Sequence, residues 1–519
     1  MNPIALNLFS SRLEAICEQM GEVLRNTAFS PNIRDRLDFS CAIFDDKGEL
    51  SAQAAHIPVH LGSMAFAMAD VIGGIEWSVG DQVILNNPYL GGTHLPDVTL
   101  IAPIFIADQL IAFVVNRAHH ANIGSEAPGS MPVSSSLDEE GLIISPQHLY
   151  RDGVANELVM KELLNYLGDS QTSGDFAAQI SANQFGVSAV TKIIEAMTVV
   201  EYQQGLNALN SYAARLADSA IKIIPDGNYT FEDFMDDDGQ GNQAIRIKLQ
   251  LSINKGEVIA DFDGTAHQVK GNINCPLSVA AAGVYYVFRC LMPSQTPSCA
   301  GVFRSIKILA PKGCLLNANY PAAVAAGNVE TSTRVVDVTL GALAKAIPEQ
   351  IPAASHGSMN NVAMGMAAGK MYDHEQWNYY ETIGGGMGAG LSGGGQSAVQ
   401  THMTNTLNTP IEVLETKYPL RVLKYAIRPR TGGEGLNQGG DGLLRQYQFM
   451  QSAHVSVLTE RRSFAPWGLA GGKDGQVGVN YLNGQLMPAK FELAVAAGDV
   501  LTIETPGGGG YGEQLKESI

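Results

Sequence analysis

The sequence predicts an α+β fold of several subdomains, with mixed helices, largely antiparallel sheets and glycine-rich loops. Three observations predict this fold class. Helical patterns recur near the N-terminus and again between residues 173 and 224. Alternating runs such as Ile245 to Leu251 are typical of half-buried antiparallel strands. The last third is dense in glycine without a fixed period, with eight glycines between Gly384 and Gly395.

The first half alternates between helical and strand-like segments. Apolar residues spaced by three and four predict an amphipathic helix over Leu6 to Leu24. Phe39 to Phe44, followed by the turn Asp45 to Gly48, predicts a β-hairpin. Further strands are expected at 83–85, 98–106 and 110–116, and two or three helices are expected at 173–224.

Pro225-Asp-Gly227 ends the helical block and marks a domain boundary. We therefore expect a motif-rich N-terminal region with the helical block at 1–224, a β-rich middle domain at 225–355, and a glycine-rich β domain at 356–519. Asp236 to Gly239 is acidic, but its spacing does not match an EF-hand, so a hairpin turn is expected there.

Composition excludes several classes of protein. The 519 residues carry a formal net charge of -18, which argues against nucleic-acid or anionic-membrane binding. The N-terminus has no apolar signal run, and the six cysteines show no C-x-x-C spacing, so a cytoplasmic protein is expected. Only 16% of residues are charged, while 56 are glycine, which indicates faces buried between subunits, glycine-shaped loops, or both.

Histidines and a carboxylate converge around one predicted hairpin. If residues 98–106 and 110–116 pair, then His94 and Asp97 lie beside the His119-His120 pair. Adjacent strand residues face opposite sides, so only one of these two histidines can join the cluster. Imidazole and carboxylate together suit zinc or manganese. The alternative is that these histidines are hydrogen-bonded core groups. One of His56 and His60 is expected to line the same pocket.

The chain resembles the hydantoinase B family, which includes the matching domain of 5-oxoprolinase and the metal-bearing subunit of acetone and acetophenone carboxylases. The resemblance extends from about residue 30 to the C-terminus. It is carried by RLDFSCAIF (36–44), HIPVHLGSM (56–64), NPYLGGTHLPD (87–97), RAHHANIG (117–124), PGSM (128–131), DFDGT (261–265), GNVETS (327–332), YETIGGG (380–386), HMTNT (402–406), YPLR (418–421) and PGGGGYG (506–512).

The resemblance implies a metal-bearing subunit of an ATP-dependent cyclic-amide hydrolase, which acts on a substrate phosphorylated by a partner. It implies one divalent ion, zinc or manganese, held by Asp38, His94, Asp97 and His119. His120 or His60 would carry the proton, or would merely support the site by hydrogen bonds. No Walker loop is present, so ATP is expected on a hydantoinase A-type partner. Self-association into a hetero-oligomer is also expected.

Two other functions remain open from the sequence. The same site would suit the metal-bearing subunit of an ATP-dependent ketone carboxylase, and a non-catalytic scaffold is the third reading. Asn122 stands where many relatives have aspartate. We interpret the glycine-rich segments as close-packed turns in which glycine supplies a positive φ, with mobile tunnel loops as the alternative. No role follows for Glu330, Arg334, Glu381, His402 or Arg421.

Overall fold

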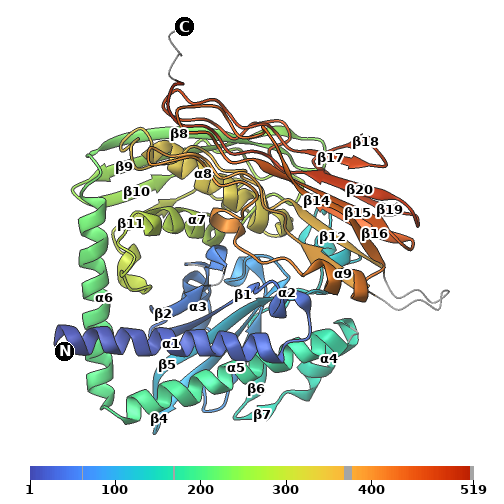
Figure 1. Cartoon of the computed structure of the whole chain (residues 1–519). Coiled ribbons are helices and arrows are strands. Elements are labelled where there is room, and N and C mark those ends of the chain that lie inside the picture. Colours follow the sequence, from blue (N-terminus) through green and yellow to red (C-terminus); the bar gives the residue numbers. More distant parts are fainter. Residues whose placement is uncertain (56, 61, 168–169, 367–376, 515–519) are drawn as a thin grey trace.

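The computed structural model describes residues 1–514 except for 56, 61, 168–169 and 367–376. It confirms an α+β fold of mixed helices and mainly antiparallel sheets. Figure 1 shows the N-terminal part in blue to green, and the sheets of the C-terminal part in orange and red on the opposite side of the molecule. None of the described helices combines the length and the apolar run that crossing a membrane requires.

The N-terminal part is built on a seven-stranded antiparallel sheet. The sequence predicts two of the hairpins in this sheet: the one formed by its first two strands, and the long central one. In spatial order the strands are β2 (Leu50–Ala55), β1 (Phe39–Asp45), β5 (Gln109–His119), β4 (Asp97–Ile106), β3 (Gln82–Leu85), β6 (Gln147–Arg151) and β7 (Val154–Ala155).

Helices cover both faces of this sheet. The predicted N-terminal helix is α1 (Pro3–Thr27); Asn2 caps it, with its side-chain oxygen accepting from the Ala5 amide at 2.8 Å. It packs with α5 (Ser170–Glu195) against one face, and α3 (Ser63–Ile72) covers the other. The remaining helices of this part are α2 (Pro31–Arg34), α4 (Glu157–Leu167) and α6 (Val199–Ile221).

The middle part is a four-stranded sheet on which one helix packs, and a second helix packs against the first. Along β9 buried and exposed residues alternate, as the sequence predicts, so one face of the strand joins the core. The Asp238 carboxylate accepts from the Gln240 and Asn242 amides, both at 2.9 Å, which closes the expected hairpin turn. The elements are β8 (Gly227–Asp237), β9 (Gln243–Asn254), β10 (Glu257–Asp261), β11 (Ile306–Leu309), α7 (Leu277–Cys290) and α8 (Ser332–Leu343).

The C-terminal part contains two further sheets with a shared apolar core. The first sheet has the order β13 (Trp377–Glu381), β12 (Asn361–Met366), β16 (Ala453–Leu458) and β19 (Lys490–Val495). The second has the order β14 (Leu420–Arg428), β15 (Gly442–Phe449), β20 (Val500–Glu504), β17 (Val479–Leu482) and β18 (Gln485–Met487), and α9 (Ile411–Lys417) precedes it.

The glycine-rich segments lie side by side as extended chains that exchange backbone hydrogen bonds. For example, the Gly440 amide donates to the Met387 carbonyl at 2.8 Å. A Cβ added to Gly395 would lie 1.8 Å from the Met387 oxygen, and one on Gly440 would lie 1.9 Å from the Gln396 oxygen. No glycine at 384–395 or 432–440 has a positive φ. Close packing of backbones therefore requires glycines such as Gly395 and Gly440, and our interpretation that they supply positive φ in turns was wrong for these two segments.

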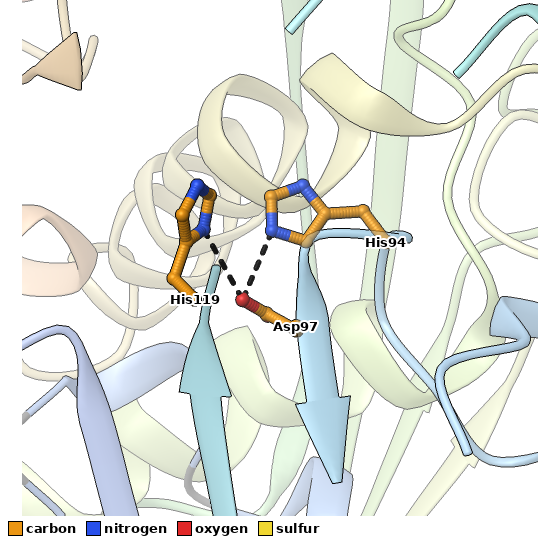
Figure 2. A group of neighbouring side chains, drawn as sticks. All are labelled: His94, Asp97 and His119. Atoms are coloured by element: carbon orange, nitrogen blue, oxygen red, sulfur yellow. Dashed lines mark ion pairs between the residues drawn. The ribbon is translucent and has the colours of Figure 1, made fainter. Parts of the chain in front are cut away.

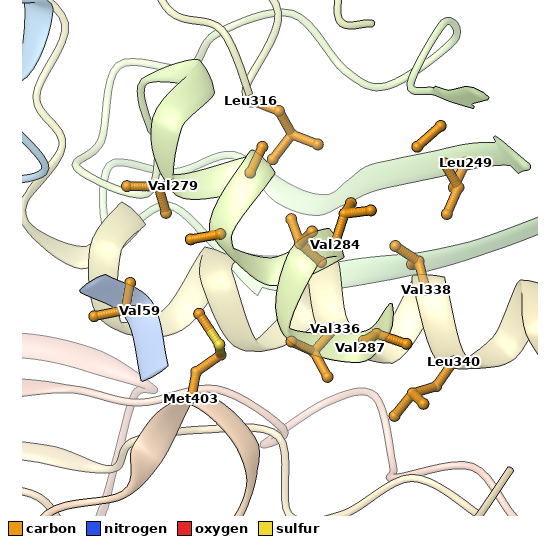
Figure 3. Close-up of a cluster of buried hydrophobic side chains, with 14 of the residues drawn as sticks. Val59, Leu249, Val279, Val284, Val287, Leu316, Val336, Val338, Leu340 and Met403 are labelled. Atoms are coloured by element: carbon orange, nitrogen blue, oxygen red, sulfur yellow. The ribbon is translucent and has the colours of Figure 1, made fainter. Parts of the chain in front are cut away.

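One apolar core joins all three segments into which we divided the sequence. Figure 3 shows Val59 from the N-terminal segment, Val284 and Val336 from α7 and α8, and Met403 from the C-terminal segment within one buried cluster. The division at residues 224 and 355 remains a prediction.

Candidate metal centre

The candidate site forms at the end of the central hairpin, where β4 begins and β5 ends. Asp97 and His119 are directly opposite in the strand register. His94 belongs to the turn that leads into β4. Asn86 holds this turn in place, because its amide group donates to the Leu95 carbonyl at 2.8 Å. The hairpin therefore brings together the three residues that the sequence placed near one another.

Both imidazoles point at the same carboxylate oxygen, as Figure 2 shows. His94 Nε2 lies 3.1 Å from Asp97 Oδ1, and His119 Nδ1 lies 3.3 Å from it. All three side chains are at most 3% exposed. An ionised carboxylate and two imidazoles removed from water in this way require partners that compensate for their lost hydration.

The second oxygen of Asp97 is fully occupied by protein donors. Thr93 Oγ1 lies 2.7 Å from Asp97 Oδ2, Asn328 Nδ2 at 3.2 Å and His60 Nε2 at 3.3 Å. Burial alone would raise the pKa of Asp97. The His94 charge and the contacts of Asp97 with the three neighbouring histidines instead hold the pKa of this carboxylate well below its ordinary value. The carboxylate is thus fixed in orientation and kept ionised, with Oδ1 left for the two imidazoles.

The orientation of His94 is set from behind the ring. Its Nδ1 lies 3.2 Å from the Ala325 carbonyl oxygen. A carbonyl only accepts, so Nδ1 carries a hydrogen, and Nε2 is the ring nitrogen that faces Asp97. The Glu140 carboxyl accepts from the Val324 and Ala325 amides at 2.8 and 2.9 Å and so anchors this segment. Burial raises the pKa of Glu140 to about 7.

His119 is held by an aromatic neighbour from β13. Its ring stacks on Tyr380 with centroids 5.1 Å apart and planes 8° from parallel. The Tyr380 hydroxyl donates to Asn361 Oδ1 at 2.5 Å, and the Arg36 guanidinium lies 4.5 Å from the Tyr380 ring centroid. Asp38 Oδ2 lies 3.9 Å from both His119 Nδ1 and Arg36 Nη2. The fourth predicted ligand, Asp38, is therefore at the edge of the cluster.

The donor set fits a divalent cation. The buried atoms His94 Nε2 and Asp97 Oδ1 make no hydrogen bond of ordinary geometry among the described residues, although they lie close together. Two nitrogen or oxygen ligands at ~2.1 Å from one ion in tetrahedral geometry lie ~3.4 Å apart, close to the separations observed. Two triplets have ligand atoms within 4.8 Å of one another: His94, Asp97 and His119, and Asp38, His60 and Asp97. Imidazole with carboxylate favours zinc or manganese over calcium or magnesium.

A small cavity adjoins the cluster. Its volume is about 10 Å³, room for a single water molecule. It is lined by Asp38, Ile57, Val59, His60, Asp97, His119, Asn328, Val329, Met359, Tyr380, Thr382 and Thr406. The residues that line it come from segments as far apart in the sequence as Asp38 and Thr406.

The two predicted proton carriers lie in different places. His60 belongs to a short 3₁₀ turn (Pro58–His60) and lines the cavity, with Nδ1 2.9 Å from Ser40 Oγ. His120 is not among the lining residues of this cavity; its Nε2 lies 2.9 Å from Gln179 Oε1, and its ring contacts Phe176. His56 lies outside the described residues. The geometry therefore favours His60 over His120 for a role next to the cluster.

Sequence reasoning gave no role to two residues of the cavity wall. Asn328 and Tyr380 both fall in the family-like motifs GNVETS and YETIGGG. Asn328 lies within a π-helical turn (Gly327–Thr331), a feature that often marks functional sites. No spacing rule connects residues 328 and 380 with a hairpin around residue 97, so only the fold shows their proximity.

Comparison with known proteins identifies relatives along the whole chain. The family model described as Hydantoinase B/oxoprolinase matches residues 2–514. The 5-oxoprolinase 1 of Arabidopsis thaliana is 39% identical over 99% of this chain, and the chain spans 42% of that protein's length. A protein of a Pseudomonas species, provisionally named as the B-type subunit of a D-/L-hydantoinase, is 32% identical, with 99% of this chain and 91% of the relative covered.

Two solved structures share the fold. The ATP-dependent caprolactamase from Pseudomonas jessenii superposes with a TM-score of 0.90 at 26% identity, covering 99% of this chain and 91% of that one. A nucleotide-free acetone carboxylase gives a TM-score of 0.87 at 17% identity, covering 98% of this chain and 76% of that one. The second likeness concerns the fold alone.

Proposed function

The chain belongs to the hydantoinase B/oxoprolinase family, and on that premise we propose that it is the ring-opening subunit of an ATP-dependent cyclic-amide hydrolase. The buried cluster of His94, Asp97 and His119 is the observation that carries the proposal. The names of the relatives add support, because caprolactam, 5-oxoproline and hydantoin all contain an amide bond within a ring.

The ATP-dependent step belongs to a partner subunit in this proposal. One relative is named as a single subunit of a hydantoinase, and the chain spans less than half of the 5-oxoprolinases it matches. We assign nucleotide binding to a hydantoinase A-type subunit, with which this chain forms a hetero-oligomer. The chain itself shows no G-x-x-x-x-G-K-[ST] phosphate loop.

The proposed reaction consumes one ATP and two water molecules. The partner transfers the γ-phosphoryl group of ATP to the amide oxygen, which makes the ring carbon a better electrophile. Water adds to this carbon, the C–N bond breaks as the nitrogen takes up a proton, and the ring opens to an acyl phosphate. A second water releases phosphate and leaves the ring-opened acid, which is an amino acid when the substrate is a lactam and an N-carbamoyl amino acid when it is a hydantoin. A zinc or manganese ion held by His94, Asp97 and His119, with Asp38 beside them, would supply a Lewis acid for the addition of water.

His60 is the residue that we propose as proton carrier. Its Nε2 donates to the ionised Asp97, so its Nδ1 accepts from the Ser40 hydroxyl. The His60 side chain lines the cavity beside the cluster, so in this proposal it takes a proton from water there and returns it to the departing nitrogen.

The ketone carboxylase remains the second candidate because the acetone carboxylase shares the fold. A scaffold without chemistry is disfavoured by the complete cluster. Co-expression with a hydantoinase A-type subunit separates the three functions. The complex should open hydantoin, 5-oxoproline or caprolactam with ATP, and should not fix bicarbonate onto acetone. Carboxylation without ring opening would establish the alternative, and no activity on either class would favour the scaffold.

Metal analysis tests the cluster itself. The purified complex should contain about one zinc or manganese ion per chain, and His94→Ala or Asp97→Ala should lose most of it. His148→Ala is the matched control, because it removes a histidine that faces Asp81 at 3.2 Å outside the cluster. Full metal content in both cluster variants would refute the assignment of these ligands.

A further inference from the structure

Asn328 projects from an unusual turn beside the cluster. The turn is a π-helix (Gly327–Thr331) that leads into α8. A Cβ on Gly327 would lie 1.8 Å from the Asn274 carbonyl oxygen, so only glycine permits this approach. The Ser332 hydroxyl donates to the Asn328 carbonyl at 2.6 Å. The backbone that carries Asn328 is therefore firmly held.

The orientation of the Asn328 amide follows from chemistry. Its Nδ2 lies 3.2 Å from Asp97 Oδ2, and an ionised carboxylate only accepts hydrogen bonds. The nitrogen must therefore face Asp97, and Oδ1 is the atom that the side chain has left to offer. Asn328 is 3% exposed, lines the cavity, and its Oδ1 has no hydrogen-bond partner among the described residues.

The other neutral polar groups of the cavity wall already have protein partners. The Tyr380 hydroxyl is bonded to Asn361, and the Thr382 and Thr406 hydroxyls are bonded to each other at 2.6 Å. Both nitrogens of His60 are occupied. A buried acceptor without a donor has lost the hydrogen bonds that water would give it, so among the neutral groups of the wall Asn328 Oδ1 has the most to gain from a ligand that donates.

We propose that Asn328 Oδ1 accepts the N–H of the substrate ring and so selects cyclic amides over ketones, an inference that rests on the proposed hydrolase function. A lactam, a hydantoin and 5-oxoproline each carry a ring N–H, whereas a ketone has no such donor. Transfer of the phosphoryl group to the amide oxygen leaves this hydrogen on the ring nitrogen, and the nitrogen still bears it after water has added to the carbon and before the C–N bond breaks. Ile57, Val59, Val329 and Met359 give the rest of the wall an apolar surface for ring methylenes.

Entry of the ring requires the wall to open, because about 10 Å³ holds no molecule larger than water. The π-turn is buried and anchored on both sides, since the Thr331 hydroxyl also donates to the Ile273 carbonyl at 2.5 Å. Asn328 is therefore a fixed reference point against which an entering ring is oriented. Its role is positioning and specificity, through a hydrogen bond that only one substrate class can make.

A cycle of two enzymes and two substrates tests the inference. The wild-type complex and Asn328→Leu are each assayed with 2-pyrrolidinone or caprolactam and with its N-methyl derivative. We expect Asn328→Leu to lower kcat/KM about tenfold for the N–H lactam and less than about threefold for the N-methyl lactam. In the Asn328→Leu complex, the number of ADP molecules formed per ring opened should also rise for the N–H lactam, because a misoriented adduct loses phosphate and reverts to the lactam.

Equal losses for both lactams would overturn the inference and leave Asn328 as a support for Asp97. Absence of ring opening by the wild-type complex with hydantoin, 5-oxoproline and caprolactam would instead refute the proposed hydrolase. Metal content per chain is measured for each variant, and it should stay unchanged. If the leucine variant is insoluble, Asn328→Ser replaces it. The loss of kcat/KM should again be larger for the N–H lactam than for the N-methyl lactam, in the same ratio. Thr406→Val, on the same wall, is the matched control and should leave the ratio between the two lactams unchanged.

Discussion

The hairpin end around Asp97 and the glycine-rich segments of the C-terminal part are both tightly specified, but by opposite means. At the hairpin, five side chains from four segments surround one carboxylate: His60, Thr93, His94, His119 and Asn328. In the glycine-rich segments, the absence of side chains allows backbones to touch. The first region places functional groups, and the second allows remote segments to pack closely.

This difference changes the meaning of the composition. Low charge and high glycine content indicated either subunit interfaces or glycine-shaped loops. The structure supplies a cause within the chain, because the segments at 384–396, 432–440 and 507–512 bond to one another through their backbones. Glycine there satisfies backbone hydrogen bonds at distances that any Cβ would prevent. Burial against a partner subunit remains a prediction that the composition alone no longer requires.

The largest expected effect is on stability in the glycine-rich region. Gly395→Ala places a methyl group where the Met387 oxygen would be 1.8 Å away, and neither backbone can move without breaking its hydrogen bonds. We expect a loss of at least about 3 kcal/mol in the free energy of unfolding, or no folded protein. Thermal or denaturant unfolding measures it.

Gly393→Ala is the matched control from the same segment. No atom lies within 4 Å of a Cβ at this position, and its φ is not positive. This variant should differ from the wild type by less than about 0.5 kcal/mol. Similar unfolding free energies for the two alanine variants would show that packing does not explain the glycines of this segment.

A smaller, pH-dependent effect is expected at Glu140, which anchors the segment behind His94. Burial raises its pKa in the folded state from 4.5 to about 7, so the folded protein binds the proton more tightly than the unfolded chain. The stabilisation is complete below about pH 4.5 and is lost as pH rises through 7. Glu140→Gln, which stays neutral, should become more stable than the wild type by up to about 3 kcal/mol between pH 5 and 8.

Denaturant unfolding at several pH values measures this difference. Glu139→Gln is the control, because Glu139 is the exposed neighbour of the buried carboxyl. Its unfolding free energy should follow the wild-type pH profile. A constant difference between Glu140→Gln and the wild type from pH 5 to 8 would mean that Glu140 is ionised throughout. The anchor of the His94 segment would then be a charged carboxylate.

The two regions also differ in how far the sequence predicts them. Pairing in a hairpin is local, so the strands flanking residues 107–109 were enough to predict that residue 97 lies opposite about residue 117, and the structure pairs Asp97 with His119. Alternation predicts that one of His119 and His120 joins the cluster, and the structure shows which one. Ala325, Asn328 and Tyr380 approach from more than 200 residues away, and no periodicity in the sequence encodes such contacts. For the glycine-rich segments, composition shows that glycine is abundant. It does not show which backbone segments lie against each glycine.

The smallest expected effect concerns His120, adjacent in sequence to His119 but turned toward another core. His120 Nε2 bonds Gln179 Oε1 at 2.9 Å, and Gln179 in turn donates to the Val98 carbonyl at 2.9 Å, so this imidazole fastens α5 to the sheet. His120→Gln should therefore lower kcat of the complex by less than about threefold, because a residue outside the cavity cannot exchange a proton with the substrate directly.

His60→Gln, within the cavity, should lower kcat far more while the chain stays folded. A pH–rate profile separates the two roles: substitution of the proton carrier alters its shape, whereas substitution of a support lowers the rate evenly. If the pH–rate profile changed in His120→Gln and stayed unchanged in His60→Gln, the proton carrier would be His120, on the side of the hairpin that faces α5.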